Sequence, residues 1–277
     1  MEENDKEMLL KWEKLNLSSD FIFGKVMQDT ELCRELLQRI FPEMDIERVE
    51  YVETQKSINP DADAKGIRLD IFVRGDDGSA YVVEMQVADT KELPKRSRYY
   101  QSITDLQLLD KGIYYEELNQ IFIVFICLFD LYGAGRHIYT FENICREDKS
   151  ISMDDGATTI FLNAKGTMDD VSDELKAFLD YVAGKKTDDP YIDKLDDAVK
   201  KAKMNREWRR EYMTLYMRDL ENIRIGKEQE REQGVKILIE TCQEFGKNRQ
   251  ETISKIQVKY AFSDAVAEQY MEKYWVG

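Results

Sequence analysis

The sequence predicts an α/β fold, with a mixed central sheet flanked by helices over residues 16–165 and a helical region over 166–277. Residues 68–87 have the pattern of a strand, a tight turn and a returning strand, and residues 121–129 form a continuous apolar run of strand length. Beyond residue 169 the chain contains one proline, and apolar residues recur at helical spacing. Hydrophobic residues make up 43% of the chain, which is enough for a sizeable core.

The first part of the chain predicts a polar lead-in followed by one helix. Residues 1–15 are mostly polar. A helix-start signal, Ser-Ser-Asp, lies at 18–20, apolar residues follow at spacings of three and four, and Pro42 ends the pattern. Beyond this helix, the sequence predicts a strand near residues 49–52 and a polar loop over 57–66.

The middle of the chain predicts most of the central sheet. Residues 68–73 and 80–87 alternate as strands, and the glycine-containing segment 74–79 between them predicts a hairpin turn. The other elements predicted here are a helix over 93–110, a strand covered on both faces over 121–129, and two short strands over 137–141 and 158–162.

In the C-terminal region the sequence predicts only helices. A helical pattern begins near 175, and further helices are predicted over 189–205, 206–226, 229–246 and 248–275. An apolar stripe over 208–223 predicts either packing within the chain or a homodimer seam. The last pattern divides into two short helices around 262–263, which loosely resembles a DNA-reading helix-turn-helix.

The charge balance limits how the chain can contact nucleic acid. It carries 55 acidic and 40 basic residues, a formal net charge of -15. This excludes a generally basic nucleic-acid coat, so that any phosphate contact must come from local basic clusters.

Histidine and cysteine content exclude several kinds of site. The one histidine, His137, excludes a His-rich metal site, and it could serve as a general base only if it reaches a metal face. The four cysteines include no C-x-x-C pair, so neither a zinc knuckle nor a disulfide framework is indicated. The acidic opening and the absence of a membrane-length apolar run predict a cytoplasmic protein that contacts no membrane.

The candidate reactive residues lie on the predicted hairpin. Asp70 and Glu84 are separated by thirteen residues, a spacing at which two carboxylates can converge across the two strands. Gln86 shares the face of Glu84 because side chains alternate along a strand. Two close carboxylates are typical of a site for Mg²⁺, which prefers oxygen ligands and often completes its shell on a substrate phosphate. The alternative is that both acids lie on an exposed sheet face.

Several segments, taken in order, resemble a known family. They are Ser-Asp-Phe-Ile-Phe-Gly-Lys at 19–25, Val-Glu-Met-Gln at 83–86, Leu-Pro-Lys-Arg-Ser-Arg-Tyr-Tyr at 93–100, and Gly-Ile-Tyr-Tyr-Glu-Glu-Leu at 112–118. Together they resemble the PD-(D/E)XK nuclease family transposases from about residue 16 to about 145. The first segment departs from the family's D-x-x-F-K pattern because Gly24 displaces the lysine by one place. The resemblance implies a restriction-endonuclease-like core over 16–165.

The resemblance also implies roles for individual residues. Asp70 and Glu84 match metal ligands, and Gln86 stands at the position that is usually lysine, so these three are the catalytic candidates. Glutamine carries no positive charge, which puts the rate in doubt unless Lys65, Arg68 or Arg96 supplies it. We expect that Gln86→Lys would retain or raise activity.

Other matched residues keep two interpretations. Asp20 is either a third metal ligand or a helix N-cap. Arg96 and Tyr99 either contact a DNA phosphate or pack against the sheet edge. Arg68 is a further candidate DNA contact.

A basic cluster in the helical region is the strongest candidate footprint for a DNA backbone. It consists of Lys200, Lys201, Lys203, Arg206, Arg209 and Arg210, and its alternative is a solvated helix face balanced by the acids of 188–197. A second basic group, Lys91, Lys95, Arg96 and Arg98, lies closer in sequence to the predicted metal site.

The function predicted from these residues and this resemblance is a DNA endonuclease that depends on Mg²⁺ or Mn²⁺ and is linked to recombination or mobile elements. Such a protein would be cytoplasmic, associated with the nucleoid when bound to DNA, and a homodimer through its C-terminal helices is an open expectation. The alternative is a catalytically silent DNA-binding or protein-interaction module that retains the nuclease fold.

Overall fold

The computed structural model describes residues 2–59, 65–109, 112 and 114–275. Its contacts divide the chain into two compact units, Met1–Arg209 and Arg210–Gly277. Among the described residues, none of the helices is both long and apolar enough to span a membrane.

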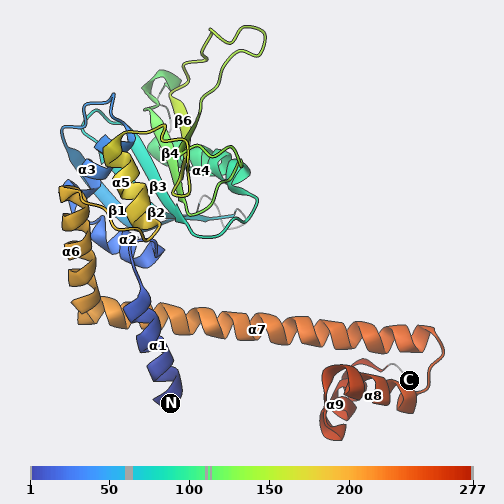
Figure 1. Cartoon of the computed structure of the whole chain (residues 1–277). Coiled ribbons are helices and arrows are strands. Elements are labelled where there is room, and N and C mark those ends of the chain that lie inside the picture. The colour runs from blue at the N-terminus through green and yellow to red at the C-terminus, as the bar shows by residue number, and fades with distance from the viewer. Residues whose placement is uncertain (1, 60–64, 110–111, 113, 276–277) are drawn as a thin grey trace. The chain divides into compact units, whose positions relative to one another are not determined.

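The first unit is built on a six-stranded sheet in the order β1-β2-β3-β4-β6-β5 (Figure 1). The first three strands form an antiparallel meander, β3, β4 and β6 run parallel, and β5 is an antiparallel edge strand. The strands are β1 Val49–Ile58, β2 Ile67–Gly75, β3 Ala80–Gln86, β4 Ile121–Cys127, β5 Ile138–Phe141 and β6 Ala157–Asn163. The predicted mixed sheet is therefore present.

The β2–β3 hairpin forms where the alternating pattern predicts it. Ile71 pairs with Val83 and Arg74 pairs with Ala80. At the turn Asp77 accepts hydrogen bonds from the Ser79 backbone N–H and hydroxyl, and Gly78 adopts a φ of +82°, which favours glycine.

Helices cover both faces of the sheet. α2 and α3 pack on β1, β2 and β3, and α4 packs on β4. In this unit the helices are α1 Glu2–Lys14, α2 Asp20–Val26, α3 Thr30–Ile40, α4 Leu93–Leu108, α5 Asp173–Val182 and α6 Pro190–Met204, with a short 3-10 turn η1 at Tyr115–Glu117.

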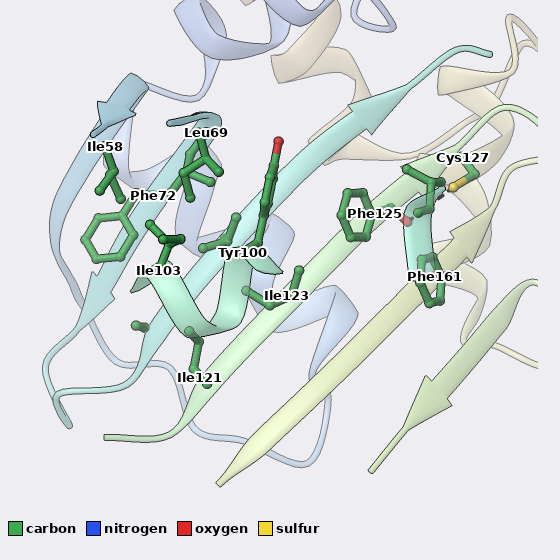
Figure 2. Packing of buried hydrophobic residues seen from close by; sticks show 14 residues of the cluster. Ile58, Leu69, Phe72, Tyr100, Ile103, Ile121, Ile123, Phe125, Cys127 and Phe161 are labelled. Atoms are coloured by element: carbon green, nitrogen blue, oxygen red, sulfur yellow. Dashed lines mark hydrogen bonds between the residues drawn. The ribbon is translucent and has the colours of Figure 1, made fainter. Parts of the chain in front are cut away.

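The core beneath α4 consists of alternate residues of the strands. Figure 2 shows Tyr100 and Ile103 of α4 packed in one cluster with Ile123 and Phe125 of β4. β4 is buried along its whole length, as its continuous apolar run predicts. Burial of this apolar surface fixes α4 against β4.

Two elements of the first unit differ from the sequence prediction. The single helix expected from residue 18 onward is two helices, because Asp29 accepts hydrogen bonds from the Glu31 and Leu32 N–H groups and starts α3 as its N-cap. The predicted loop over 57–66 begins later than expected, since β1 continues through Ile58, which is buried, and residues 60–64 of this loop lie outside the described residues.

Helices alone form the second unit. α7 Arg206–Glu244 begins in the first unit, and α8 Arg249–Tyr260 and α9 Asp264–Tyr274 follow it. A small core that includes Ile239, Ile256 and Met271 joins these three helices. The two short helices expected at the C-terminus are present, whereas the two patterns expected over 206–226 and 229–246 are one continuous helix.

Candidate active site

Backbone N–H groups of the β2–β3 hairpin hold the carboxylates of Asp70 on β2 and Glu84 on β3. Glu84 Oε1 accepts from the Asp70 backbone N–H at 2.8 Å, and Asp70 Oδ2 accepts from the Met85 N–H at 3.0 Å. The Glu84 side chain is only 2% exposed. The hairpin therefore holds both predicted carboxylates at one place with fixed orientations.

The β1–β2 ladder is irregular at the same place. It pairs Thr54 with Ile71 and Lys56 with Leu69 and skips the pair between them, Gln55 and Asp70. Gln55 has a φ of +56°, an uncommon conformation for a residue with a side chain, and its amide Nε2 lies 3.5 Å from Asp70 Oδ1. Irregular ladder positions re-aim side chains, and this one leaves the Asp70 N–H for Glu84.

Arg96, near the start of α4, is the cation of this site. Its guanidinium Nη2 donates to Glu84 Oε2 at 2.7 Å, Nη1 donates to Gln86 Oε1 at 3.2 Å, and Nε donates to the Tyr100 hydroxyl at 3.0 Å. The guanidinium carbon also lies 5.0 Å from the Tyr100 ring centroid and 5.4 Å from that of Phe125. All three nitrogens of the Arg96 guanidinium thus donate to residues of the hairpin or of α4.

These side chains border an open pocket of about 370 Å³ at the carboxyl end of β3. Its lining residues are Ser18, Ser19, Asp20, Gln55, Arg68, Asp70, Glu84, Met85, Gln86, Val87 and Arg96. Six sequence candidates therefore border one pocket: the three catalytic candidates together with Asp20, Arg68 and Arg96.

The carboxylates of the pocket bind protons more tightly than exposed acids do. Burial raises the pKa of Asp70 to about 6, and the nearby Asp20 carboxylate adds to this against the Met85 N–H and two arginines. Burial and the neighbouring Asp70 charge raise the pKa of Glu84 to about 8, against the lowering effect of Arg96. A further positive charge beside these acids would favour their charged forms.

The donor chemistry of the pocket fits a hard divalent cation. The candidate ligands are carboxylate oxygens, and Mg²⁺ takes one or two such groups while keeping waters or substrate oxygens for its other positions. Among the described residues no group of three or more acidic, histidine or cysteine side chains is arranged to hold a metal ion. The fit therefore rests on the pair Asp70 and Glu84, with Asp20 on the pocket rim.

Two sequence candidates differ in position from what the sequence suggested. Asp20 is the first residue of α2 and not its N-cap, which is Ser19. The Tyr99 hydroxyl donates to the Lys65 carbonyl oxygen at 2.5 Å, and Tyr99 does not border the pocket. Tyr100 is the tyrosine that contacts Arg96.

The basic cluster of α6 and early α7 lies outside the pocket lining. Lys200 is paired with Asp196 at 2.7 Å and Asp197 at 3.2 Å, and the Lys203 ammonium donates to the Glu13 carbonyl. Lys201 and Arg206 are exposed.

His137 is buried away from the pocket. Its backbone N–H donates to Asp170 Oδ1, and the His137 ring is enclosed between β5 and the segment before α5. It does not border the carboxylate pocket.

Two residues of the site were not among the sequence candidates. Tyr100 supplies an acceptor for Arg96, and burial raises its pKa to about 12, which keeps the phenol protonated. The spacing Arg-x-x-x-Tyr, one helical turn, was the signal for it in the sequence. Gln55 lies opposite Asp70 because of its positive φ, for which the sequence carries no signal.

Comparison with models of protein families gives a match. The model of a protein family described as PD-(D/E)XK nuclease family transposase matches residues 19–223, well over half of the chain. No curated protein and no solved structure matches the chain. The matched span contains the sheet and the helices that flank it. It also contains ten of the eleven residues that line the pocket, since Ser18 lies just before its start.

Proposed function

The chain belongs to the PD-(D/E)XK nuclease family transposases, and from this premise we propose that it is a DNA endonuclease that requires Mg²⁺ or Mn²⁺. The observation that carries the proposal is that backbone N–H groups hold two carboxylates, Asp70 and Glu84, at the edge of an open pocket that two arginines also border. Acids that hold a cation beside basic groups that face a phosphate are the parts that phosphodiester hydrolysis needs.

In this proposal Asp70 and Glu84 hold the metal ion, and Asp20 on the pocket rim is a third candidate ligand. A bound Mg²⁺ or Mn²⁺ lowers the pKa of a water molecule and neutralises charge on the phosphate during attack. The hairpin contributes rigidity, because the backbone N–H groups of Asp70 and Met85 fix one oxygen of each acid.

Gln86 and Arg96 together replace the usual lysine in this proposal. The Gln86 amide carries no charge, but its oxygen accepts from Arg96 and places a guanidinium beside the pocket. A guanidinium keeps its charge at any working pH and can donate a charge-assisted hydrogen bond to a phosphate.

DNA binding by so acidic a chain requires local positive charge. Arg68 and Arg96 border the pocket, and Lys201 and Arg206 are exposed on the basic cluster. We assign the phosphate next to the cut to the two arginines and the flanking backbone to the exposed part of the cluster. A role in recombination or mobile elements follows from the family's description, and a homodimer through the C-terminal helices would bring two such pockets to one duplex.

Plasmid cleavage tests the proposal. Purified wild-type protein should nick or linearise DNA with Mg²⁺ or Mn²⁺ and not with EDTA. Asp70→Asn and Glu84→Gln should each lower the rate at least about a hundredfold, because each removes a charge that a metal ligand needs while keeping the shape of the side chain. Glu92→Gln, which changes an exposed acid outside the pocket, is the matched control and should cleave normally.

Two results would contradict the proposal. Cleavage that survives both substitutions would place the reaction elsewhere. DNA binding without metal binding or cleavage would favour a silent module that retains the nuclease fold.

A further inference from the structure

We propose that Arg96 competes with the metal ion for Glu84: it is the counter-ion of the metal-free site and releases Glu84 when a divalent cation binds. The inference rests on the proposed function, since it concerns the same two carboxylates. It adds a positioning role for Arg96 and a conformational step that precedes cleavage.

The first argument is that every carboxylate oxygen of Glu84 already has a donor. Oε1 accepts from the Asp70 N–H at 2.8 Å and Oε2 accepts from Arg96 Nη2 at 2.7 Å. The backbone donor cannot leave without disrupting the hairpin, whereas the arginine side chain can rotate. A cation that binds Oε2 therefore shares that oxygen with the Arg96 guanidinium, and Arg96 is the partner that can move away.

The second argument is electrostatic. The Glu84 side chain is 2% exposed and that of Arg96 is 24% exposed, so water screens this pair poorly. A guanidinium and a divalent cation on one carboxylate oxygen would be two positive groups within a few ångströms in a region of low dielectric. Their repulsion favours an arrangement in which only one of them contacts Glu84.

The third argument is that Arg96 keeps a place after it leaves Glu84. Gln86 Oε1 accepts from Nη1 and the Tyr100 hydroxyl accepts from Nε, and the Tyr100 and Phe125 rings lie within 5.4 Å of the guanidinium carbon. These four contacts are to uncharged groups and do not depend on Glu84. The Nη2 group alone becomes free, at the wall of the pocket where a substrate phosphate would lie.

This arrangement gives Gln86 a reason to be uncharged. A lysine at position 86 would repel the guanidinium, whereas an amide oxygen holds it. In the metal-free site the Arg96 guanidinium then contacts Glu84. In the metal-loaded site the same guanidinium is directed at the substrate.

Nuclear magnetic resonance of the arginine side chains of the full-length protein tests this directly. The protein is uniformly labelled with ¹⁵N and titrated with MgCl₂ without DNA, and the Arg96 side-chain signals are identified by their loss in Arg96→Lys. Hydrogen exchange of the Arg96 Nη2 group should become at least about tenfold faster on saturation, since a hydrogen bond to a charged partner is lost. The Nε–H should stay protected by Tyr100.

Two controls make the result specific. Arg39, which donates to Asp189 at 2.9 Å far from the pocket, should not respond to MgCl₂. In Glu84→Gln the Arg96 Nη2 group should exchange rapidly from the start and should not change with MgCl₂.

The outcomes separate this inference from the proposed function. If MgCl₂ shifts the backbone signals of Asp70 and Met85 but leaves Arg96 Nη2 protected, the competition is wrong and the metal site stands. If no backbone signal of the hairpin shifts, the metal site itself is wrong and both proposals fail.

Discussion

At the scale of single residues, the site depends on a backbone N–H group of β2 that the β1–β2 ladder does not use. The Asp70 N–H reaches Glu84 because the ladder skips its pairing with Gln55. Backbone N–H groups hold the two carboxylates in place, burial raises the pKa of both, and the charge of Asp70 raises that of Glu84 further. A site of this kind is prepared for a cation and unfavourable without one.

Gln86 shows how the contacts change an expectation from the sequence. From charge alone, Gln86→Lys was expected to retain or raise activity. Since Gln86 Oε1 accepts from Arg96, a lysine would remove that acceptor and repel the guanidinium. We now predict that Gln86→Lys cleaves DNA about tenfold more slowly than wild type.

A plasmid-cleavage time course measures this, with melting temperature as the check on folding. Gln86→Met, which removes the acceptor without adding charge, separates the two effects and should lose less activity. A lysine variant as active as wild type would mean that the contact with Arg96 does not matter for the reaction.

The pKa shifts predict how the metal-free protein responds to pH. The folded protein holds a proton on Asp70 and on Glu84 to higher pH than an unfolded chain, which loses both near about pH 4, and the Arg96 guanidinium limits this effect at Glu84. The folded state thus binds more protons in this range, and the free energy of unfolding should fall as the pH rises from about 5 to 8.

Urea unfolding in EDTA at several pH values measures this slope. Glu84→Gln should flatten it, because the amide does not titrate, and added MgCl₂ should reverse much of the loss at pH 8. Equal slopes in wild type and Glu84→Gln would show that Glu84 is charged throughout.

Residue positions were predictable where a strand or motif fixed them. Asp70, Glu84 and Gln86 border one pocket as their spacing on a hairpin suggested. The choice between Tyr99 and Tyr100 was not predictable, since neighbouring helix residues differ by about 100° in direction and the pattern did not fix which side of α4 faces the sheet.

At the scale of elements, regular patterns were more informative than interruptions. The β2–β3 hairpin, β4 and α4 follow from alternation, an apolar run and a helical pattern. The break between α2 and α3 was missed because its cause is one side chain, Asp29. The polar stretch 227–233 does not end α7, and ion pairs one turn apart, such as Arg224 with Glu221 and Glu228, stabilise the helix just before it.

The end of α6 and the start of α7 carry a prediction about DNA affinity. Lys200 is already paired with two acids, whereas Lys201 and Arg206 are exposed. Lys201→Glu with Arg206→Glu should weaken binding to all DNA sequences about equally. The slope of log K against log salt should become shallower by about one unit for each lost phosphate contact.

Fluorescence anisotropy with Ca²⁺ in place of Mg²⁺ provides the measurement, and Lys200→Glu is the matched control with a smaller expected effect. An unchanged salt slope in the double variant would move the backbone contact to Lys91, Lys95 and Arg98 near the start of α4.

At the scale of the whole molecule, the net charge of -15 attracts cations, which favours the proposed metal site. An acidic surface repels polyanions, so that in the proposed function DNA approaches only where arginines and a bound metal ion offset that field. The boundary between the two compact units falls between Arg209 and Arg210, within the basic cluster. The pocket lies wholly within the first unit. The pocket can therefore be studied in the intact chain without reference to α8 and α9.

The central claim is that Asp70 and Glu84 hold one divalent cation, and calorimetric titration of the full-length protein with MnCl₂ tests it most directly. Wild type and Glu92→Gln should both bind one Mn²⁺ per chain with the same affinity. Asp70→Asn and Glu84→Gln, folded to the same melting temperature in EDTA, should each lose that binding. Mn²⁺ binding that is unchanged in both variants would contradict the claim.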